Sequence, residues 1–244
     1  MPNSPLPCCA FAVHRTPIAD EQKPVLRSLL LAHCVLQPQW GYFQGMSDIG
    51  CVALKAAADA GCPDVNAFGL LHGMLLHSAD NWTSADLGGV WRQHRAMRAI
   101  LQIVDRKLAQ KLAYCDGQMG STAEQMPYAF LFGAVFLRLQ RELVSLEEAM
   151  RLWEVSWAIG GHFHIVVLVA FVRSQRRAIM RPGVGSAEVH QLFSRLHETQ
   201  CAAPLLLAAR ALHAKRGVSE ALEQAMAAAP TRGPTTSGTR NQVL

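Results

Sequence analysis

The spacing of apolar residues constrains the fold of this chain more than any other feature of its sequence. From residue 20 onward, apolar side chains recur three or four positions apart, which places them on one face of an α-helix. Residues 23–36 are typical, with Leu26 and Leu29 on the apolar face and Pro24 in a first turn that tolerates proline. No window alternates apolar and polar residues as a half-buried strand would. The pattern therefore predicts an all-α protein.

Glycine, proline and polar residues interrupt this spacing and divide the chain into roughly ten helices around one core. The loop between the third and fourth helices is predicted at residues 79–89. Helices are predicted, with limits set to within several residues, at 23–36, 47–60, 64–78, 90 to about 112, 123–139, 162–180, 187–197 and 203–215.

A further helix is predicted from its start signal. Ser145 with Glu148 three positions later forms a capping box, in which the serine side chain takes up a free N–H group of the first turn. The apolar stripe behind it carries Trp153, which we interpret as a core residue rather than a site residue. Arg141 and Glu142, just ahead of the box, are interpreted as a helix-end or buried pair.

Composition narrows the classes of partner. Half of the 244 residues are apolar, which is ample for a buried core. The net charge is +5, and this excess favours an acidic partner or an anionic membrane surface. Basic and aromatic residues do not interleave along one face, so nucleic-acid binding is not expected. The longest apolar run, residues 163–172, is about half of what crosses a bilayer, so it predicts a core helix and no transmembrane segment.

Cysteine and histidine usage argues against disulfides and metal sites. The seven cysteines include no C-x-x-C pair and no histidine partners at zinc spacing, so they are interpreted as reduced thiols of a cytoplasmic protein. His162 and His164 lie two positions apart, which does not place two ligands on one helix face. Residues 1–7 lack the features of a secretory signal.

The most distinctive local feature is the stretch 40–50, with the sequence Trp-Gly-Tyr-Phe-Gln-Gly-Met-Ser-Asp-Ile-Gly. Its glycines allow backbone angles closed to other residues, so it predicts a tight turn that holds Gln44 away from the body of the protein. Ser47 or Asp48 is expected to cap the helix that follows. By its residues alone, the stretch is more typical of an ordinary loop with a polar tip.

The same stretch resembles, nearly residue for residue, the glutamine-finger motif of TBC-domain proteins, the GTPase-activating proteins of Rab-type small GTPases. Three further blocks agree with that family in order and spacing. Residues 103–108 resemble a helix that leads into an Asp and then a Leu, residues 136–143 resemble an F-x-R-E-L segment, and residues 149–158 resemble an A-x-x-L-W-E-x-x-W helix. The resemblance covers about residues 13–216 and is closest to the branch that includes the yeast-type vacuolar Rab activators.

The resemblance implies a fold and an activity. The fold is a single multi-helix TBC-like (Rab-GAP) domain at residues 13–216, after a disordered segment 1–12 and before a short helix and disordered tail at 217–244. The activity is acceleration of GTP hydrolysis on a Rab-family GTPase. The chain itself is then not an enzyme and needs no cofactor, because the partner carries the GTP and Mg²⁺.

Two residues are implied to act on the partner's nucleotide. Arg15, in a Val-His-Arg-Thr block, matches the family's arginine finger, and Gln44 is implied to replace the GTPase's own glutamine. The residues implied to hold Gln44 in place are Gly41, Tyr42, Gly45 and Asp48.

The chain departs from the family pattern around the arginine. Ala12 stands where the family has an Asp, Cys9 stands where it has an Ile, and Gln44 follows Arg15 by only 29 positions. The first helices of the family fold are also expected to be missing, which would leave apolar faces of the next helices uncovered. These departures keep an alternative open, namely a catalytically impaired Rab-binding or scaffold protein.

Either function implies a place in vesicle-mediated and intracellular protein transport. The expected partner is a Rab-family small GTPase. The expected location is the cytoplasm, with peripheral association with endomembranes through that partner.

Overall fold

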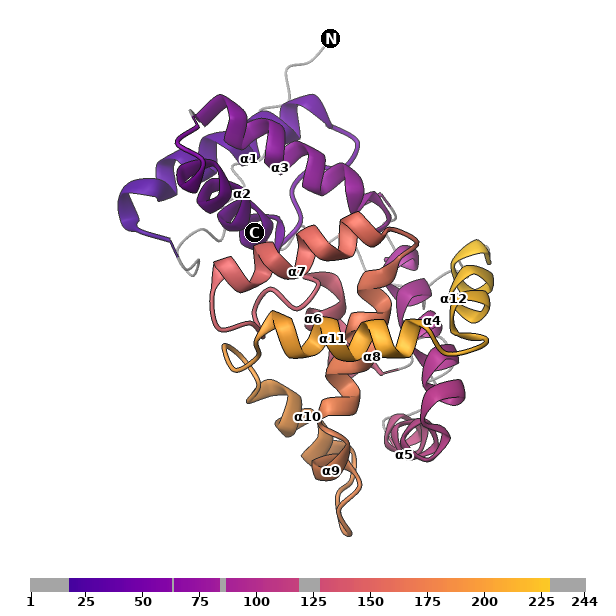
Figure 1. Ribbon diagram of the computed structural model, residues 1–244. Helices are drawn as coiled ribbons and strands as arrows, with labels where there is room; N and C mark the ends of the chain where they lie inside the picture. The colour runs from indigo at the N-terminus through magenta and orange to yellow at the C-terminus, as the bar shows by residue number, and fades with distance from the viewer. Residues whose placement is uncertain (1–17, 63, 84–86, 119–127, 229–244) are drawn as a thin grey trace, which may run out of the picture. The chain divides into compact units, whose positions relative to one another are not determined.

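The computed structural model describes residues 18–62, 64–83, 87–118 and 128–228. Within these residues the chain is helical, and a single isolated bridge between Leu143 and Gln200 is the β-type pairing found there. The all-α prediction is confirmed. The α-helices are α1 (Lys23–Leu36), α2 (Met46–Asp59), α3 (Asp64–His77), α4 (Gly88–Val104), α5 (Arg106–Gly117), α6 (Phe132–Phe136), α7 (Leu146–Ile159), α8 (Phe163–Ser174), α9 (Arg176–Ile179), α10 (Ser186–Ser194), α11 (Ala202–His213) and α12 (Val218–Ala227) (Figure 1).

The contacts between helices group the chain into two compact units. We call the described residues up to Thr83, with α1–α3, the N-terminal unit, and those from Leu87 onward, with α4–α12, the C-terminal unit. The limits 13–216 of a single domain stay a prediction. Residues 1–12 and the tail after residue 228, both expected to be disordered, lie outside the described residues.

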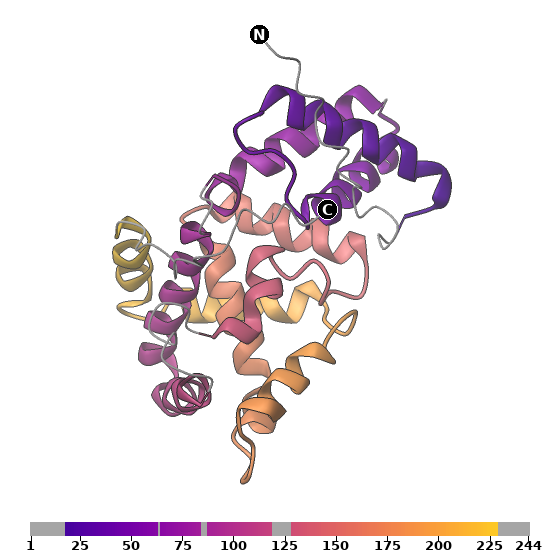
Figure 2. The ribbon, with the colours of Figure 1, turned by 180° about the vertical axis from the view of Figure 1, so that it is seen from behind.

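In the N-terminal unit, each of the three helices packs against the other two (Figure 2). The leucines that define the apolar face of α1, among them Leu26, are buried as the sequence predicts. Gly50 of α2 faces this leucine so closely that a Cβ atom at position 50 would lie 2.4 Å from Cδ1 of Leu26. The glycine therefore allows α1 and α2 to approach closely.

An apolar groove of about 540 Å³ lies on the surface of the N-terminal unit, along α1 and α3. Several of its side chains are exposed, including Val35 and Leu36. The groove is lined by Ser28, Leu31, Ala32, Val35, Leu36 and Phe68. These side chains form an apolar surface on α1 and α3, the helices next to the motif.

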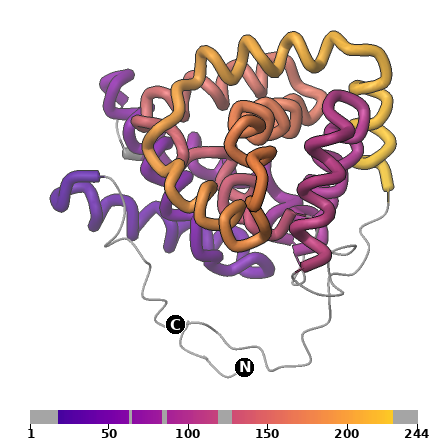
Figure 3. The backbone as a smooth tube through the Cα atoms, turned by 90° about the horizontal axis from the view of Figure 1, so that it is seen from below, coloured from indigo at the N-terminus to yellow at the C-terminus, as the bar shows by residue number. Residues whose placement is uncertain are grey.

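Helix α8 is the centre of the C-terminal unit, since all ten residues from Phe163 to Val172 are buried. Helices α4, α7 and α11 pack against it (Figure 1), and α12 lies beside α4 (Figure 3). The core-helix interpretation of this apolar run is confirmed. No helix in the described stretches combines the length and apolar character needed to cross a bilayer.

The serine half of the predicted capping box opens α7. Ser145 Oγ accepts a hydrogen bond from the Glu148 N–H at 3.3 Å, in the β conformation typical of an N-cap. The Glu148 carboxylate, however, accepts from the N–H of Ala202 at the start of α11, at 2.5 Å. The acidic residue of the box therefore joins two helices.

The helix predicted at residues 90–112 is two helices, α4 and α5, with a break at Asp105. The Asp105 side chain caps α5 by accepting from the Leu108 N–H at 3.2 Å. Its other oxygen accepts from Nε of Arg176 at 2.7 Å, and Nε of Arg173 lies 3.8 Å away. These contacts hold Asp105 in a non-helical conformation. Similarly, the helix predicted at 162–180 is interrupted at Gln175, between α8 and α9.

The continuous helix predicted at residues 123–139 is not formed over the part that the structure describes, 128–139. Only a 3-10 turn, Ala129–Leu131, and the five residues of α6 are helical there. The helix ends because Arg138 and Leu139 adopt left-handed conformations, with φ of 50° and 65°. The Arg138 carbonyl instead accepts a hydrogen bond from Nε1 of Trp153, at 3.0 Å. Packing against α7 therefore overrides the helical propensity of this segment.

Candidate functional site

The candidate site is the turn between α1 and α2, where the structure exposes Gln44. The residues that follow it are buried, and Met46, the first residue of α2, is fully so. The predicted exposure of Gln44 is therefore observed. The polar side chain projects from a short connection whose far end is fixed in the core.

Two glycines set the path of this turn. Gly41 has φ of 66°, and Gly45 has φ of 105°, both in the region that favours glycine. The Gly45 carbonyl accepts from the N–H groups of Asp48, at 3.1 Å, and Ile49, at 3.3 Å. Gly45 thus occupies the N-cap position of α2.

The prediction that Ser47 or Asp48 caps this helix is wrong. The helix begins at Met46, so both residues lie inside its first turn, and the N-cap Gly45 has no side chain to offer. Asp48 is instead a buried carboxyl group, 6% exposed, at the N-terminal end of α2. The partial positive charge at a helix N-terminus favours an acidic residue there.

Aromatic contacts anchor the residues that precede Gln44. The Phe43 ring lies 6.2 Å from the buried ring of Trp82, measured between centroids, and Trp82 Nε1 donates to Ser78 Oγ at 3.0 Å. The Phe43 N–H also donates to the sulfur of Met46, at 3.4 Å. Tyr42, half-buried, directs its hydroxyl toward Ser47 of α2. Neighbours on both sides therefore hold Gln44 in place.

Two histidines, His33 and His72, lie close to Trp40 in the first part of the turn. The ring of Trp40 packs against the fully buried His33, with centroids 5.6 Å apart. Nδ1 of His33 lies 3.1 Å from Nδ1 of His72. Burial, together with the neighbouring His72, lowers the pKa of His33 to about 4, so this ring is neutral at pH 7. Sequence reasoning missed this pair, although His33 follows Leu29 and Leu30 at helical spacing.

The other sequence-predicted finger, Arg15, lies outside the described residues. Its position relative to Gln44 therefore stays a prediction. Within the described part of the chain, no group of three or more His, Cys, Asp or Glu side chains is arranged to hold a metal ion.

A comparison with known families decides what this motif belongs to. The model of the Rab-GTPase-TBC domain matches residues 13–180, a stretch that contains Arg15, Gln44 and the helices through α9. The chain belongs to the Rab-GTPase-TBC domain family. Its resemblance to TBC proteins at the sequence level is thereby confirmed.

Relatives of this TBC domain agree with that assignment. It is 26% identical to human "TBC1 domain family member 17" over 191 residues, which cover 78% of this chain and 27% of the relative. It is 29% identical to "Rab GTPase-activating protein 22" of Arabidopsis thaliana over 133 residues, or 54% of this chain and 22% of the relative. The matched stretch thus spans about a quarter of the length of these curated relatives.

A solved structure supports the fold. The crystal structure of the Ypt/Rab-GAP domain of Gyp1p matches with a TM-score of 0.60 and 16% sequence identity, covering 85% of this chain and 66% of that one. At this identity the match shows the all-α TBC fold alone. Within that fold, the described part of the motif presents one exposed amide on a turn with both sides anchored.

Proposed function

We propose that this TBC domain activates GTP hydrolysis by a Rab-family small GTPase, with Gln44 and Arg15 acting on the partner's nucleotide. One observation carries the proposal. Gln44 is exposed, while Phe43 and Met46 on either side of it are packed into the N-terminal unit. Such a pre-positioned polar group loses little conformational freedom when a partner binds.

Gln44 would act through its side-chain amide. An amide both accepts and donates hydrogen bonds, so one group contacts the attacking water and the terminal phosphate together. Small GTPases use a glutamine of their own to orient this water, and Gln44 would take its place. The rigid turn supports this role, because the glutamine must hold the attacking water in the correct orientation rather than bind it tightly.

Arg15 would supply positive charge. A guanidinium with several fixed donors stabilises the negative charge that redistributes as the bond to the terminal phosphate breaks. Arginine fingers in other GTPase systems accelerate hydrolysis by about 10³–10⁵-fold. The matched family region begins at residue 13 and therefore includes this arginine.

The remaining chemistry would come from the partner. GTP and Mg²⁺ bind to the GTPase, so the TBC domain works without a cofactor of its own. Membrane-attached Rab proteins would bring the domain to the cytoplasmic face of endomembranes, where it would act in vesicle-mediated transport.

The test is a hydrolysis screen against a panel of GTP-loaded Rab proteins. Wild-type protein should accelerate hydrolysis by at least one of them. Gln44→Ala should reduce the acceleration by about a hundredfold or more, and Arg15→Ala by about a thousandfold. The matched controls are Gln39→Ala and Arg27→Ala, which remove an exposed glutamine from the first part of the same connection and an exposed arginine of α1. If all four variants match wild type, the two-finger proposal is lost.

The second candidate function is Rab binding without activation. Ala12 favours it, because the family's aspartate three positions before the arginine is absent. Stable binding of a GTP-loaded Rab, with unchanged hydrolysis across the panel, would support the scaffold. A Gln44→Ala variant would then bind about as well as wild type.

A further inference from the structure

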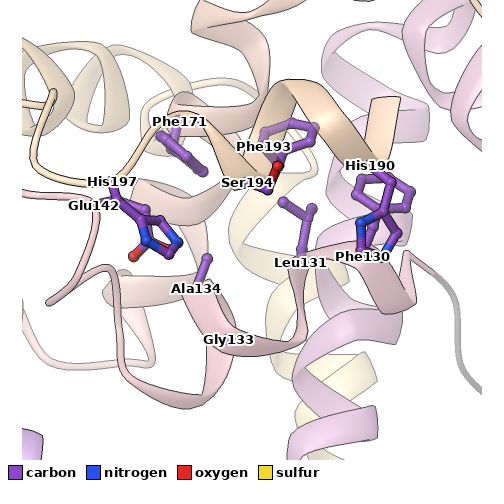
Figure 4. Close-up of a pocket in the computed structure, with 10 residues that line it drawn as sticks. All are labelled: Phe130, Leu131, Gly133, Ala134, Glu142, Phe171, His190, Phe193, Ser194 and His197. Atoms are coloured by element: carbon purple, nitrogen blue, oxygen red, sulfur yellow. The ribbon is translucent and has the colours of Figure 1, made fainter. Parts of the chain in front are cut away.

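A partly enclosed pocket of about 180 Å³ lies in the C-terminal unit, on a different set of helices from Gln44 (Figure 4). Its walls come from the turn before α6, from α6 itself, from α8, and from α10 with the residues just after it. Three phenylalanines line it, Phe130, Phe171 and Phe193. Their ring centroids lie 5.4 Å apart for Phe130 and Phe193, and 5.6 Å apart for Phe171 and Phe193.

One carboxyl group lines this aromatic pocket. Glu142 is only 6% exposed, and its Oε2 atom is buried without a hydrogen-bond partner among the described residues. Burial is the main reason that the pKa of Glu142 is raised to about 7. A buried acceptor without a donor is destabilising. A ligand that donates a hydrogen bond to this oxygen would remove that cost.

The backbone around Glu142 is fixed. Its carbonyl accepts from the N–H groups of Thr199, at 3.0 Å, and Gln200, at 2.9 Å. This pairing with the chain after α10 holds the glutamate at the edge of the pocket. Figure 4 shows the carboxyl group and the His197 ring at one end of the pocket, and His190 and Phe130 at the other.

We propose that this pocket binds a small organic cation, with a flat aromatic body packed against the phenylalanine rings and a protonated nitrogen paired with Glu142. The aromatic walls favour such a body, and the faces of the phenylalanine rings also attract positive charge. Because an apolar cavity of about 150 Å³ holds benzene, the volume here suits one ring with a short polar substituent.

Other ligand classes fit less well. An anion would be repelled by the ionised form of Glu142, and a purely apolar molecule would leave Oε2 unpaired. Two polar lining residues, His190 and His197, are exposed and leave room for solvent around the ligand's edge. Arg141, the neighbour of Glu142 in sequence, is exposed and is not part of the pocket lining.

The test uses three probes with the same ring and different charges. Benzamidine is the cation, benzamide its neutral counterpart and benzoate the anion. Saturation-transfer NMR and calorimetric titration of the full chain should show saturable binding of benzamidine at one site. Benzamide and benzoate should each bind at least about tenfold more weakly.

Two variants locate the site. Glu142→Gln keeps the shape of the side chain and removes its charge, and should weaken benzamidine binding at least about tenfold. Glu154→Gln, at an exposed position of α7, is its control and should leave binding unchanged. Gly133→Leu is independent of charge. A Cβ at this exposed, pocket-lining position meets no atom within 4 Å, so the added side chain should narrow the pocket and weaken binding without straining the fold.

Thermal unfolding checks that each variant is folded. The proposal is overturned if benzamidine shows no saturable binding to wild type, if benzamide binds equally well, or if Gly133→Leu binds like wild type. None of these results depends on Rab activation, so the binding tests of the pocket and the hydrolysis test of the proposed function are independent.

Discussion

At the scale of single residues, the presentation of Gln44 depends on the glycine that follows it. Gly45 combines φ of 105° with ψ of −20° and provides the carbonyl that begins the hydrogen bonding of α2. A side chain at this position would strain the backbone, whereas Gln44 itself does not have a positive φ. The residue that orients the site is therefore not the residue that would perform the chemistry.

Gly45→Ala should destabilise the protein by about 1–3 kcal/mol, because alanine is strained at this backbone conformation. The matched control is Gly73→Ala in α3, where φ is ordinary and a Cβ meets no atom within 4 Å. That substitution should stabilise the helix by roughly 0.5–1 kcal/mol. Urea unfolding of both variants gives the comparison. Equal and small effects of the two would show that Gly45 is not conformationally required.

The sequence predicted the centre of the candidate site better than its surroundings. Gly41 and Gly45 are local signals, so the exposed turn at Gln44 follows from neighbouring residues. The contact between His33 and His72 joins positions 39 apart in the chain, and no local pattern predicts it. The pocket around Glu142 depends in the same way on α10, which lies some fifty residues later in the sequence.

At the scale of helices, Asp105 shows how one side chain ends an element whose apolar spacing continues. The periodicity runs on from α4 into α5, so the spacing alone predicts a single helix. The aspartate both caps α5 and pairs with Arg176, which comes from a segment about seventy positions away. The capping contact is local and can be predicted from sequence, whereas the pair with Arg176 cannot.

Asp105→Ala should destabilise the C-terminal unit by about 1–3 kcal/mol, since both the cap and the charge pair are lost. Asp105→Asn keeps a capping oxygen and should have a smaller effect. Asp59→Ala is the control, because it removes an exposed ion pair with Lys55 that should contribute less than about 1 kcal/mol. Denaturant unfolding measures all three variants. The alanine variant at position 105 should be the least stable, the asparagine variant intermediate, and the control at position 59 the most stable.

The helices that the sequence predicted well are those with start and stop signals of their own. α1 has the predicted limits, Lys23–Leu36, because prolines lie near both of its ends. α7 begins where Ser145 predicts. The failure at α6 has a different origin, since its end depends on the hydrogen bond from Trp153 to the Arg138 carbonyl. That bond forms only after the helices pack.

At the scale of the whole molecule, the two units carry buried titratable groups with opposite responses to pH. In the N-terminal unit, burial lowers the pKa of His33 from 6.5 to about 4. Between these two pH values the unfolded chain binds a proton at His33 and the folded unit does not. In the C-terminal unit, burial raises the pKa of Glu142 from 4.5 to about 7 and that of Asp116 from 3.8 to about 6. There the folded state takes up the protons first.

Lowering the pH from 7.5 to 5 should therefore destabilise the N-terminal unit by roughly 2 kcal/mol through His33. It should stabilise the C-terminal unit by a similar amount through Glu142. The indole N–H signals of Trp82 and Trp153, followed by NMR during urea titration, report on the two units separately. His33→Phe should remove the first response, and Glu142→Gln most of the second. If lowering the pH moved the urea midpoints of the Trp82 and Trp153 signals of wild type in the same direction, the expectation would be contradicted.

The uninterrupted burial of α8 has a consequence for how the molecule opens. Because other helices cover this one along its length, water reaches its amide hydrogens only when the surrounding unit unfolds. In deuterated solvent, the amides of residues 167–172 should exchange last, long after those of the peripheral α12. Their exchange rate would then report the stability of the entire C-terminal unit.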